Sequence, residues 1–167
     1  MKRPLAVAAT LAATALVSLS TVVPAHAIEY VSDTCNFGDK ANCFAIFFNS
    51  QNEYGMSTSS CFMSNKDIDD HYGVNSPNGN ILVLYQFGYN YQPINSNLGG
   101  SVCRPNEGSG QQLKNNAASV VNGDPWASYT VFYNSNFYGT AQTIGAYSKA
   151  NLIAKLHDNN ASHRRNG

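Results

Sequence analysis

One pattern of aromatic, Asn, Ser and Gly residues occurs twice in the chain and restricts the folds that it can adopt. Residues 128–144 read SYTVFYNSNFYGTAQTI, and residues 43–59 read CFAIFFNSQNEYGMSTS. Two further stretches, LKNNAAS at 113–119 and LHDNNAS at 156–162, lie 43 residues apart. Each unit therefore opens with an aromatic strand and a Gly turn and closes on an Asn-rich stretch that ends in Ser. This repetition predicts two related β-units.

The two units differ in length. The second spans 35 residues, from 128 to 162, whereas the first spans 77, from 43 to 119. The extra residues of the first unit lie between Ser64 and Gly110. Extra length in one copy of a repeated scaffold indicates a functional loop or an added hairpin.

The start of the chain has the pattern of an export signal. Lys2 and Arg3 precede an Ala/Leu/Val-rich run, and Ala25-His26-Ala27 forms a small-x-small cleavage site. A transmembrane anchor is the competing interpretation, but the run is weakly apolar and ends at the cleavage site. We therefore expect a signal peptide at 1–27 and one secreted domain at 28–167, free of the membrane after cleavage.

The four cysteines all lie in the exported part, which predicts two disulfides with three connectivities open. Cys35 and Cys43 are close and bracket a turn-like segment, which favours pairing them and leaves Cys61 with Cys103. A zinc site is the alternative, but no C-x-x-C spacing supports it.

Short aromatic and β-branched runs at 43–48, 81–87 and 129–133 predict strands, bounded by Asn, Gly, Ser and Pro. The chain contains 21 Asn, which suit turns better than helices. The best helix candidate is YSKANLIAKL, in which Ser148 could cap one turn before Leu152 and Leu156. These features favour an all-β fold.

The balance of charge excludes one class of partner. Without Lys2 and Arg3, eight basic side chains face ten acidic ones, so the exported part is mildly acidic. Nucleic-acid binding needs a basic stripe, which the sequence lacks. We expect no nucleic-acid partner and a monomer.

The second unit carries a recognisable motif. Phe132, Phe137 and Gly139 spell aromatic-x4-aromatic-x-Gly, and Ser162 closes the unit. The pattern resembles the Greek-key motif of βγ-crystallins, in which Gly tolerates the bend, two rings pack over it and the closing Ser hydroxyl binds the hairpin.

In the first unit Phe48, Gly55 and Ser119 fit the same pattern, whereas Glu53 stands where the second ring belongs. The resemblance implies a βγ-crystallin-like double Greek-key sandwich with a long insert in the first unit.

More narrowly, the chain resembles a family of secreted actinobacterial peptidase inhibitors typified by the Streptomyces metalloproteinase inhibitor. The resemblance rests on the export signal, the Cys pair before FAIFF, and the phrases LKNNAASVVN, TVFYNSNFYG and DNNASH. It covers about residues 35–64 and 111–163 and implies inhibition of an extracellular peptidase. No stretch matches the family's reactive loop, so the inhibitory loop stays unassigned. The insert tethered by Cys61 and Cys103 is the surface we expect.

Many microbial βγ-crystallins bind calcium through paired [Asn/Asp]-[Asn/Asp]-x-x-[Ser/Thr]-Ser stretches, whose oxygens suit this ion. Two stretches match five of these six positions, and Val120 and His163 stand at the sixth. With few carboxylates, they predict weak calcium binding at most and no other cofactor. The candidate ligands are Asn115, Asn116, Ser119, Asp158, Asn159 and Ser162. The alternative is that the serines only fasten the hairpins.

Hydrolase motifs such as G-x-S-x-G and H-E-x-x-H are missing from the sequence, and we expect no enzyme. The segment DIDDHYG gathers acidic residues and a histidine, which could bind a cation or act as acid and base; a solvated acidic loop is the simpler interpretation. His157 and His163 flank Asp158, but we expect no site there. The residues of DIDDHYG in question are Asp67, Asp69, Asp70 and His71.

Alternating aromatic residues at 85–91 lie on one face of an extended segment, which suggests either a recognition surface or a buried face. They are Tyr85, Phe87, Tyr89 and Tyr91. The leading hypothesis is a secreted peptidase inhibitor that inserts a rigid loop into the enzyme cleft. The alternatives are a non-inhibitory calcium-stabilised or glycan-binding module, and an antimicrobial toxin of the same fold.

Overall fold

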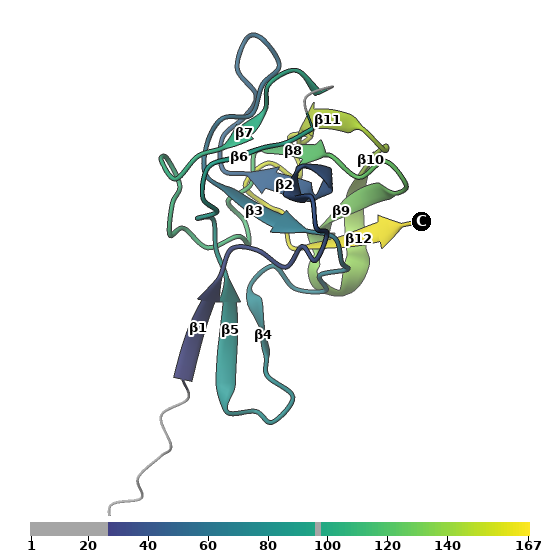
Figure 1. The fold of residues 1–167 in the computed structure, drawn as a ribbon. Coiled ribbons are helices and arrows are strands. Elements are labelled where there is room, and N and C mark those ends of the chain that lie inside the picture. The colour runs from purple at the N-terminus through teal and green to yellow at the C-terminus, as the bar shows by residue number, and fades with distance from the viewer. Residues whose placement is uncertain (1–26, 96–97) are drawn as a thin grey trace, which may run out of the picture.

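The computed structural model describes residues 27–95 and 98–167, and these form an almost purely β structure (Figure 1). The predicted signal peptide lies outside the described residues except for Ala27. In chain order the elements are β1 (Ala27–Val31), the 3-10 turn η1 (Lys40–Asn42), β2 (Phe44–Phe47), β3 (Cys61–Ser64), β4 (Gly73–Asn75), β5 (Ile81–Tyr85), β6 (Gln92–Pro93), β7 (Val102–Cys103), β8 (Ser119–Asn122), β9 (Ser128–Asn134), the 3-10 turn η3 (Ser135–Phe137), β10 (Tyr138–Ile144), β11 (Ser148–Asn151) and β12 (Ser162–Asn166).

Two antiparallel sheets make the sandwich. The first has the order β11-β8-β2-β3, and the second has the order β10-β9-β12. Each unit gives a segment to the other unit's sheet. β11 of the second unit pairs with β8, and Ile68 of the first unit exchanges two backbone hydrogen bonds of 2.9 Å with His163 in β12. This exchange makes the architecture a double Greek key.

The repeat-equivalent residues meet at the centre of the molecule. The rings of Phe44 in β2 and Tyr129 in β9 stack with centroids 4.3 Å apart and planes 3° apart. Both side chains are buried in the main core between the sheets, together with Ile46, Phe62, Val120 and Val131. The two units therefore face one another across an approximate twofold axis.

The first sheet is also covered on its outer face, which explains why all of β2 is buried. A second apolar cluster there contains Ala45, Phe47 and Met63 of the strands and Ile94 and Leu98 of the insert. Disulfides Cys35–Cys43 and Cys61–Cys103, the pairing favoured by the sequence, lie in the same cluster. In the second sheet, by contrast, burial alternates along β9.

The rest of the insert projects from the sandwich. β5 pairs with β4 in a hairpin and with β1 in parallel, forming a three-stranded sheet that extends away from the body (Figure 1). We call β1, β4, β5 and the turn 76–80 the ribbon. Parallel pairing of β1 with β5 joins residues more than 50 positions apart, which strand periodicity cannot predict.

The predicted helix at 147–156 is wrong. Residues 148–151 form strand β11, and turns follow at 154–158. Pairing with four residues of β8 holds this segment as a strand, and the apolar Leu152 and Leu156 are buried just after it instead of on a helix face. The described residues contain no helix of the length and hydrophobicity that a bilayer-spanning segment requires.

Candidate functional site

The two closing serines fasten the two hairpins in the same way. Ser119 Oγ donates to Asn49 O at 2.6 Å, and Ser162 Oγ donates to Asn134 O at 2.7 Å. Asn49 and Asn134 are equivalent residues of the repeated NS pair. Both serines are fully buried. Their hydroxyls therefore act within the fold, as the βγ-crystallin resemblance implies.

The ring-and-glycine bend is complete only in the second unit. Phe132 and Phe137 pack edge-to-face with centroids 5.9 Å apart, and Gly139 has φ +87°. In the first unit Gly55 also has a positive φ of +67°, but Glu53 stands at the position of the second ring, so Phe48 has no ring partner within the hairpin. Phe48 instead packs against Phe87 of the insert at 5.6 Å.

The predicted calcium stretches lie side by side. Asn115 N donates to Asn160 O and Asp158 N donates to Ala117 O, both at 2.9 Å. Asn115 and Asp158 share positive φ values of 62° and 54°. These matched bonds relate the stretches by the same approximate twofold axis as the hairpins.

Each stretch lines a hollow together with the hairpin of the other unit. One hollow, of about 230 Å³, is lined by Lys114, Asn115, Asn134, Ser135 and other residues. Its equivalent, of about 400 Å³, is lined by His157, Asp158, Asn49, Ser50 and others. The candidate ligands Ser119 and Ser162 do not line either hollow, and their oxygens bind the hairpins.

A basic side chain spans each hollow at the same repeat position. Lys114 Nζ donates to Ser135 Oγ and to Asp70 Oδ1, both at 2.9 Å. His157 Nε2 lies 3.1 Å from Ser50 Oγ, and its Nδ1 lies 3.1 Å from Asp158 Oδ2. Asn116, another candidate ligand, uses its amide on the carbonyls of Gln112 and Lys114. The described residues contain no group of three or more His, Cys, Asp or Glu side chains suited to a metal.

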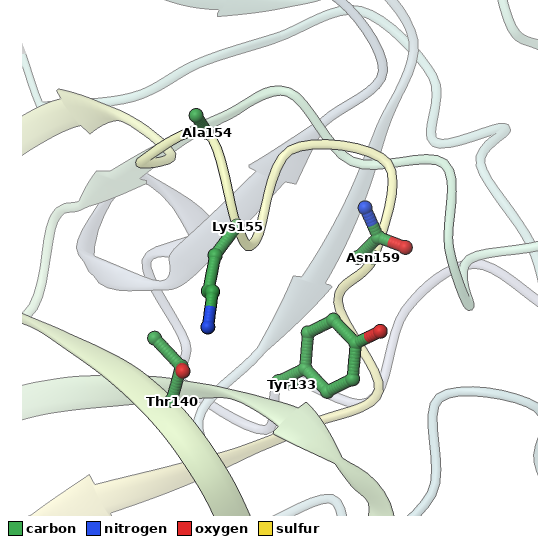
Figure 2. Close-up of a pocket in the computed structure, with 5 residues that line it drawn as sticks. All are labelled: Tyr133, Thr140, Ala154, Lys155 and Asn159. Carbon is green, nitrogen blue, oxygen red and sulfur yellow. The ribbon is translucent and has the colours of Figure 1, made fainter.

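A further hollow adjoins the one beside Lys114. It measures about 420 Å³ and is lined by Tyr133, Thr140, Ala154, Lys155 and Asn159 (Figure 2). Tyr133 and Asn159 line both this hollow and the one beside Lys114. We call the two adjoining hollows the trough.

The DIDDHYG segment is not a solvated loop throughout. Asp70 pairs with Lys114, and Asp67 accepts a hydrogen bond from Arg165 N at 2.8 Å. His71 is fully buried and donates its backbone N–H to Ala161 O. Ile68 adds a further contact, since it pairs with His163 at the edge of the second sheet. Together these contacts bind the segment to the second unit.

His71 and His163 form a buried pair that the sequence did not predict. His71 Nε2 lies 2.8 Å from His163 Nδ1, and Asn160 Nδ2 lies 2.8 Å from His71 Nδ1. Asn160 Oδ1 accepts from two backbone N–H groups, so its Nδ2 must donate to His71. His71 Nε2–H then donates to His163, and both rings are neutral.

Burial is the main cause of the shifted pKa values in this pair. It lowers the pKa of His163 to about 3, opposed in part by a contact with the backbone of Lys66. Burial and the neighbouring His163 also hold the pKa of His71 well below its usual range. The pair therefore forms part of the buried polar interior that joins the first unit to the second.

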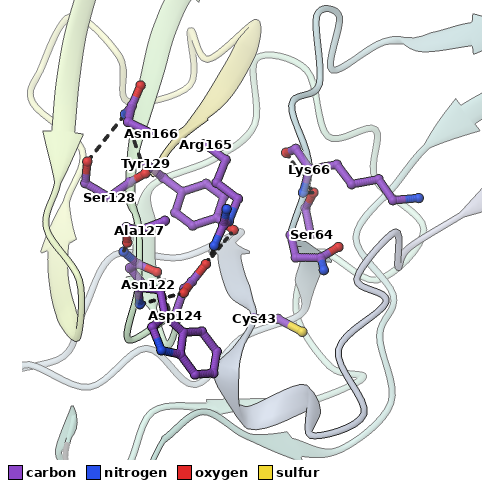
Figure 3. A network of polar contacts seen from close by, with 12 residues as sticks. Cys43, Ser64, Lys66, Asn122, Asp124, Ala127, Ser128, Tyr129, Arg165 and Asn166 are labelled. Carbon is purple, nitrogen blue, oxygen red and sulfur yellow. Dashed lines mark hydrogen bonds and ion pairs between the residues drawn. The ribbon is translucent and has the colours of Figure 1, made fainter.

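A second polar network fastens the junction between the units (Figure 3). Arg165 Nε donates to the fully buried Asp124 Oδ2 at 2.9 Å, and Tyr129 OH donates to the same oxygen at 3.3 Å. Burial and Asp124 raise the pKa of Tyr129, and the hydrogen bond to Asp124 raises the pKa of Arg165. The network gives the buried Asp124 side chain two hydrogen-bond donors, one of them the charged guanidinium of Arg165.

The aromatic series 85–91 does not form one exposed face. Tyr85 and Phe87 are buried in the main core, Tyr89 packs against the second cluster, and Tyr91 is exposed beside Arg104. The four side chains therefore do not form the shared recognition surface that the sequence suggested. Exposed apolar side chains gather on the ribbon instead.

The ribbon carries apolar side chains that no other described element covers. Ile28, Tyr30 and Val74 are 54%, 61% and 45% exposed. The backbone register places Ile28 across from Leu82, and Tyr30 across from Leu84, on one face of the sheet. At the base of this face a hollow of about 250 Å³ is lined by Tyr30, Tyr72, Leu84 and others.

The turn at the tip of the ribbon is held by its own hydrogen bonds. Ser76 N donates to Ile81 O, and Gly79 N donates to Ser76 O, both at 2.8 Å. Ser76 Oγ accepts from Ile81 N at 3.0 Å and donates to Asn78 Oδ1 at 2.6 Å. Gly79 supplies the left-handed φ of +70° that the turn requires. The tip is thus both exposed and ordered.

No protein-family model matches the chain, and no curated protein matches it. A solved structure described as "Evolution of the eye lens beta-gamma-crystallin domain fold" is similar, with a TM-score of 0.44 and 13% sequence identity. The likeness covers 74% of this chain and 84% of that one. The TM-score and the sequence identity are both low, and the fold is identified instead by the exchanged strands and the paired serines described above. By those features the chain is an all-β protein with the double Greek-key fold of βγ-crystallins.

Proposed function

We propose that the protein is a secreted, monomeric inhibitor of an extracellular peptidase and that the ribbon is its inhibitory surface. The observation that carries the proposal is that the insert builds an ordered, apolar hairpin outside the sandwich. The core between the two main sheets does not include Ile28, Tyr30 or Val74, so their exposure has no role in packing it.

A peptidase cleft accepts an extended chain, and the ribbon offers one whose conformation is already fixed. The tip of the ribbon is fixed by the bonds of Ser76, so little loop entropy is lost on binding. Exposed apolar residues beside such a tip are the anchors that dominate the energy of protein interfaces. Val74 lies two residues before the turn, and Ile81 directly follows it.

The proposal is tested by titrating the protein 28–167 against thermolysin-like and subtilisin-like peptidases. We expect inhibition of at least one enzyme at micromolar concentration or below. Val74→Lys should weaken that inhibition at least about tenfold, because it places a charge in a desolvated contact. Ile153→Lys is the matched control, since Ile153 is 44% exposed and lies outside the ribbon.

Two results would contradict the proposal at different levels. Activity of every peptidase in the panel at saturating protein would exclude the inhibitory function. Equal losses from Val74→Lys and Ile153→Lys would retain the function and remove the ribbon as its surface.

A further inference from the structure

One pair of equivalent aromatic residues has different surroundings in the two units. Phe48 and Tyr133 each precede the Asn-Ser pair of their hairpin, and the closing serines bind the two hairpins alike. In the first unit the insert covers Phe48. Gly108 lies so close that a Cβ built on it would stand 2.1 Å from Phe48 Cγ. The side chain of Phe48 is thus in close contact with the backbone of Gly108, and no larger residue would fit there.

Tyr133 is the uncovered counterpart. The second unit has no insert, and the Tyr133 side chain is 43% exposed between the two hollows of the trough. The lining of the trough combines apolar groups, such as Tyr133 and Ala154, with hydrogen-bonding groups, such as Thr140 and Asn159 (Figure 2). A ligand suited to it has one apolar face and a polar edge.

The trough also carries positive charge. Lys114 is paired with Asp70, but Lys155 is exposed and makes no ion pair within residues 27–95 and 98–167. The exported part of the chain is mildly acidic overall, so this local charge does not follow from the composition. An anionic group on the ligand would meet Lys155.

We propose that the trough binds an acidic oligosaccharide. The C–H face of a pyranose ring stacks on the exposed ring of Tyr133, at the position that the insert covers in the first unit. The amide of Asn159 and the hydroxyl of Thr140 bind sugar hydroxyls, and Lys155 binds a carboxylate. The trough shares no residue with the ribbon, so a protein bound to an acidic polysaccharide would keep its ribbon free.

Calorimetric titration of the protein 28–167 with hexameric oligogalacturonate tests the proposal, with cellohexaose as the neutral probe. We expect oligogalacturonate to bind and cellohexaose to bind at least about tenfold more weakly. Tyr133→Ala should reduce the affinity for oligogalacturonate at least about tenfold through the lost stacking. Tyr138→Ala is the matched control, because Tyr138 is 70% exposed and does not line the trough. Lys155→Gln should weaken binding and reduce its salt dependence.

Absence of binding, or equal losses from Tyr133→Ala and Tyr138→Ala, would overturn the site. Equal affinity for cellohexaose would overturn the acidic specificity. Peptidase inhibition by Tyr133→Ala distinguishes this proposal from the inhibitory one, because the variant should inhibit as the unchanged protein does.

Discussion

At the scale of single residues, a few buried polar groups hold the two units to their hairpins and to each other. Ser162 Oγ donates to Asn134 O and accepts from Phe137 N, so one hydroxyl satisfies two backbone groups. This pairing matters for stability, because a buried group left unpaired costs more free energy than a typical hydrogen bond contributes.

Ser162→Ala should therefore lower the free energy of unfolding by about 1–3 kcal/mol, since it leaves Asn134 O and Phe137 N without their partner. Urea unfolding followed by circular dichroism measures the change. Ser109→Ala serves as the control, because Ser109 is exposed. A loss no larger than that of Ser109→Ala would show that the closing hydroxyl does not stabilise the fold.

The buried histidine pair predicts a stability that depends on pH. The pKa of His163 is about 3 in the folded protein and near 6.5 in the unfolded chain, and that of His71 is lowered in the same direction. Below pH 6.5 the unfolded chain binds protons that the folded protein excludes. Stability should be full above pH 6.5 and fall on acidification, by about 1.4 kcal/mol per pH unit for each excluded proton.

Urea unfolding between pH 7.5 and roughly pH 4 measures this dependence, since the window spans the unfolded pKa. His163→Phe should flatten the curve, whereas His157→Gln should not, because His157 is partly exposed and outside the pair. Stability that is constant over the range would contradict the buried neutral pair.

At the scale of elements, similar local sequences acquire different surroundings. The loops at 113–119 and 156–162 share a positive φ at Asn115 and Asp158, yet Lys114 spans one hollow and His157 spans the other. The ammonium of Lys114 stands where a bound cation would meet Ser135 and Asp70. Calcium binding therefore stays a hypothesis only for the hollow with Asp158, which supplies one carboxylate.

We accordingly expect millimolar calcium or a chelator to change the thermal midpoint of the protein only slightly. Lys114→Ser removes the ammonium and leaves the Asp70 carboxylate unpaired, so this variant should melt lower and regain part of the loss in calcium. Lys149→Ser is the control, since Lys149 lies in β11, outside both hollows. If Lys114→Ser regained no more stability in calcium than Lys149→Ser, the Lys114 ammonium would not stand in the place of a cation.

At the scale of the whole molecule, the insert makes a symmetric scaffold asymmetric. It covers the outer face of the first sheet, covers Phe48 and extends as the ribbon, while the second unit keeps Tyr133 open. The disulfide Cys61–Cys103 ties the covering segment to β3. The two proposed binding surfaces both arise from this difference between the units.

The two disulfides should stabilise the protein unequally. They join residues 42 and 8 positions apart. In the chain-entropy account, removing them costs about 4 and about 2.5 kcal/mol respectively. Urea unfolding of Cys61→Ala/Cys103→Ala and of Cys35→Ala/Cys43→Ala compares the two costs directly. A larger loss from the second variant would indicate that the insert is held mainly by its apolar contacts.

The sequence by itself determined three strands, predicted at 43–48, 81–87 and 129–133 and found at 44–47, 81–85 and 128–134. It also determined the positive-φ glycines 55 and 139 and the serines that end each unit. These features follow from neighbours along the chain, which pattern and propensity describe. Only the tertiary structure decided the exchange of Ile68 and β11, the pairing of β1 with β5 and the burial of His71 against His163. Each of these joins segments distant in the sequence, and such contacts leave no local period. The same reason made 147–156 look helical, because the partner of β11 is not visible in its own sequence.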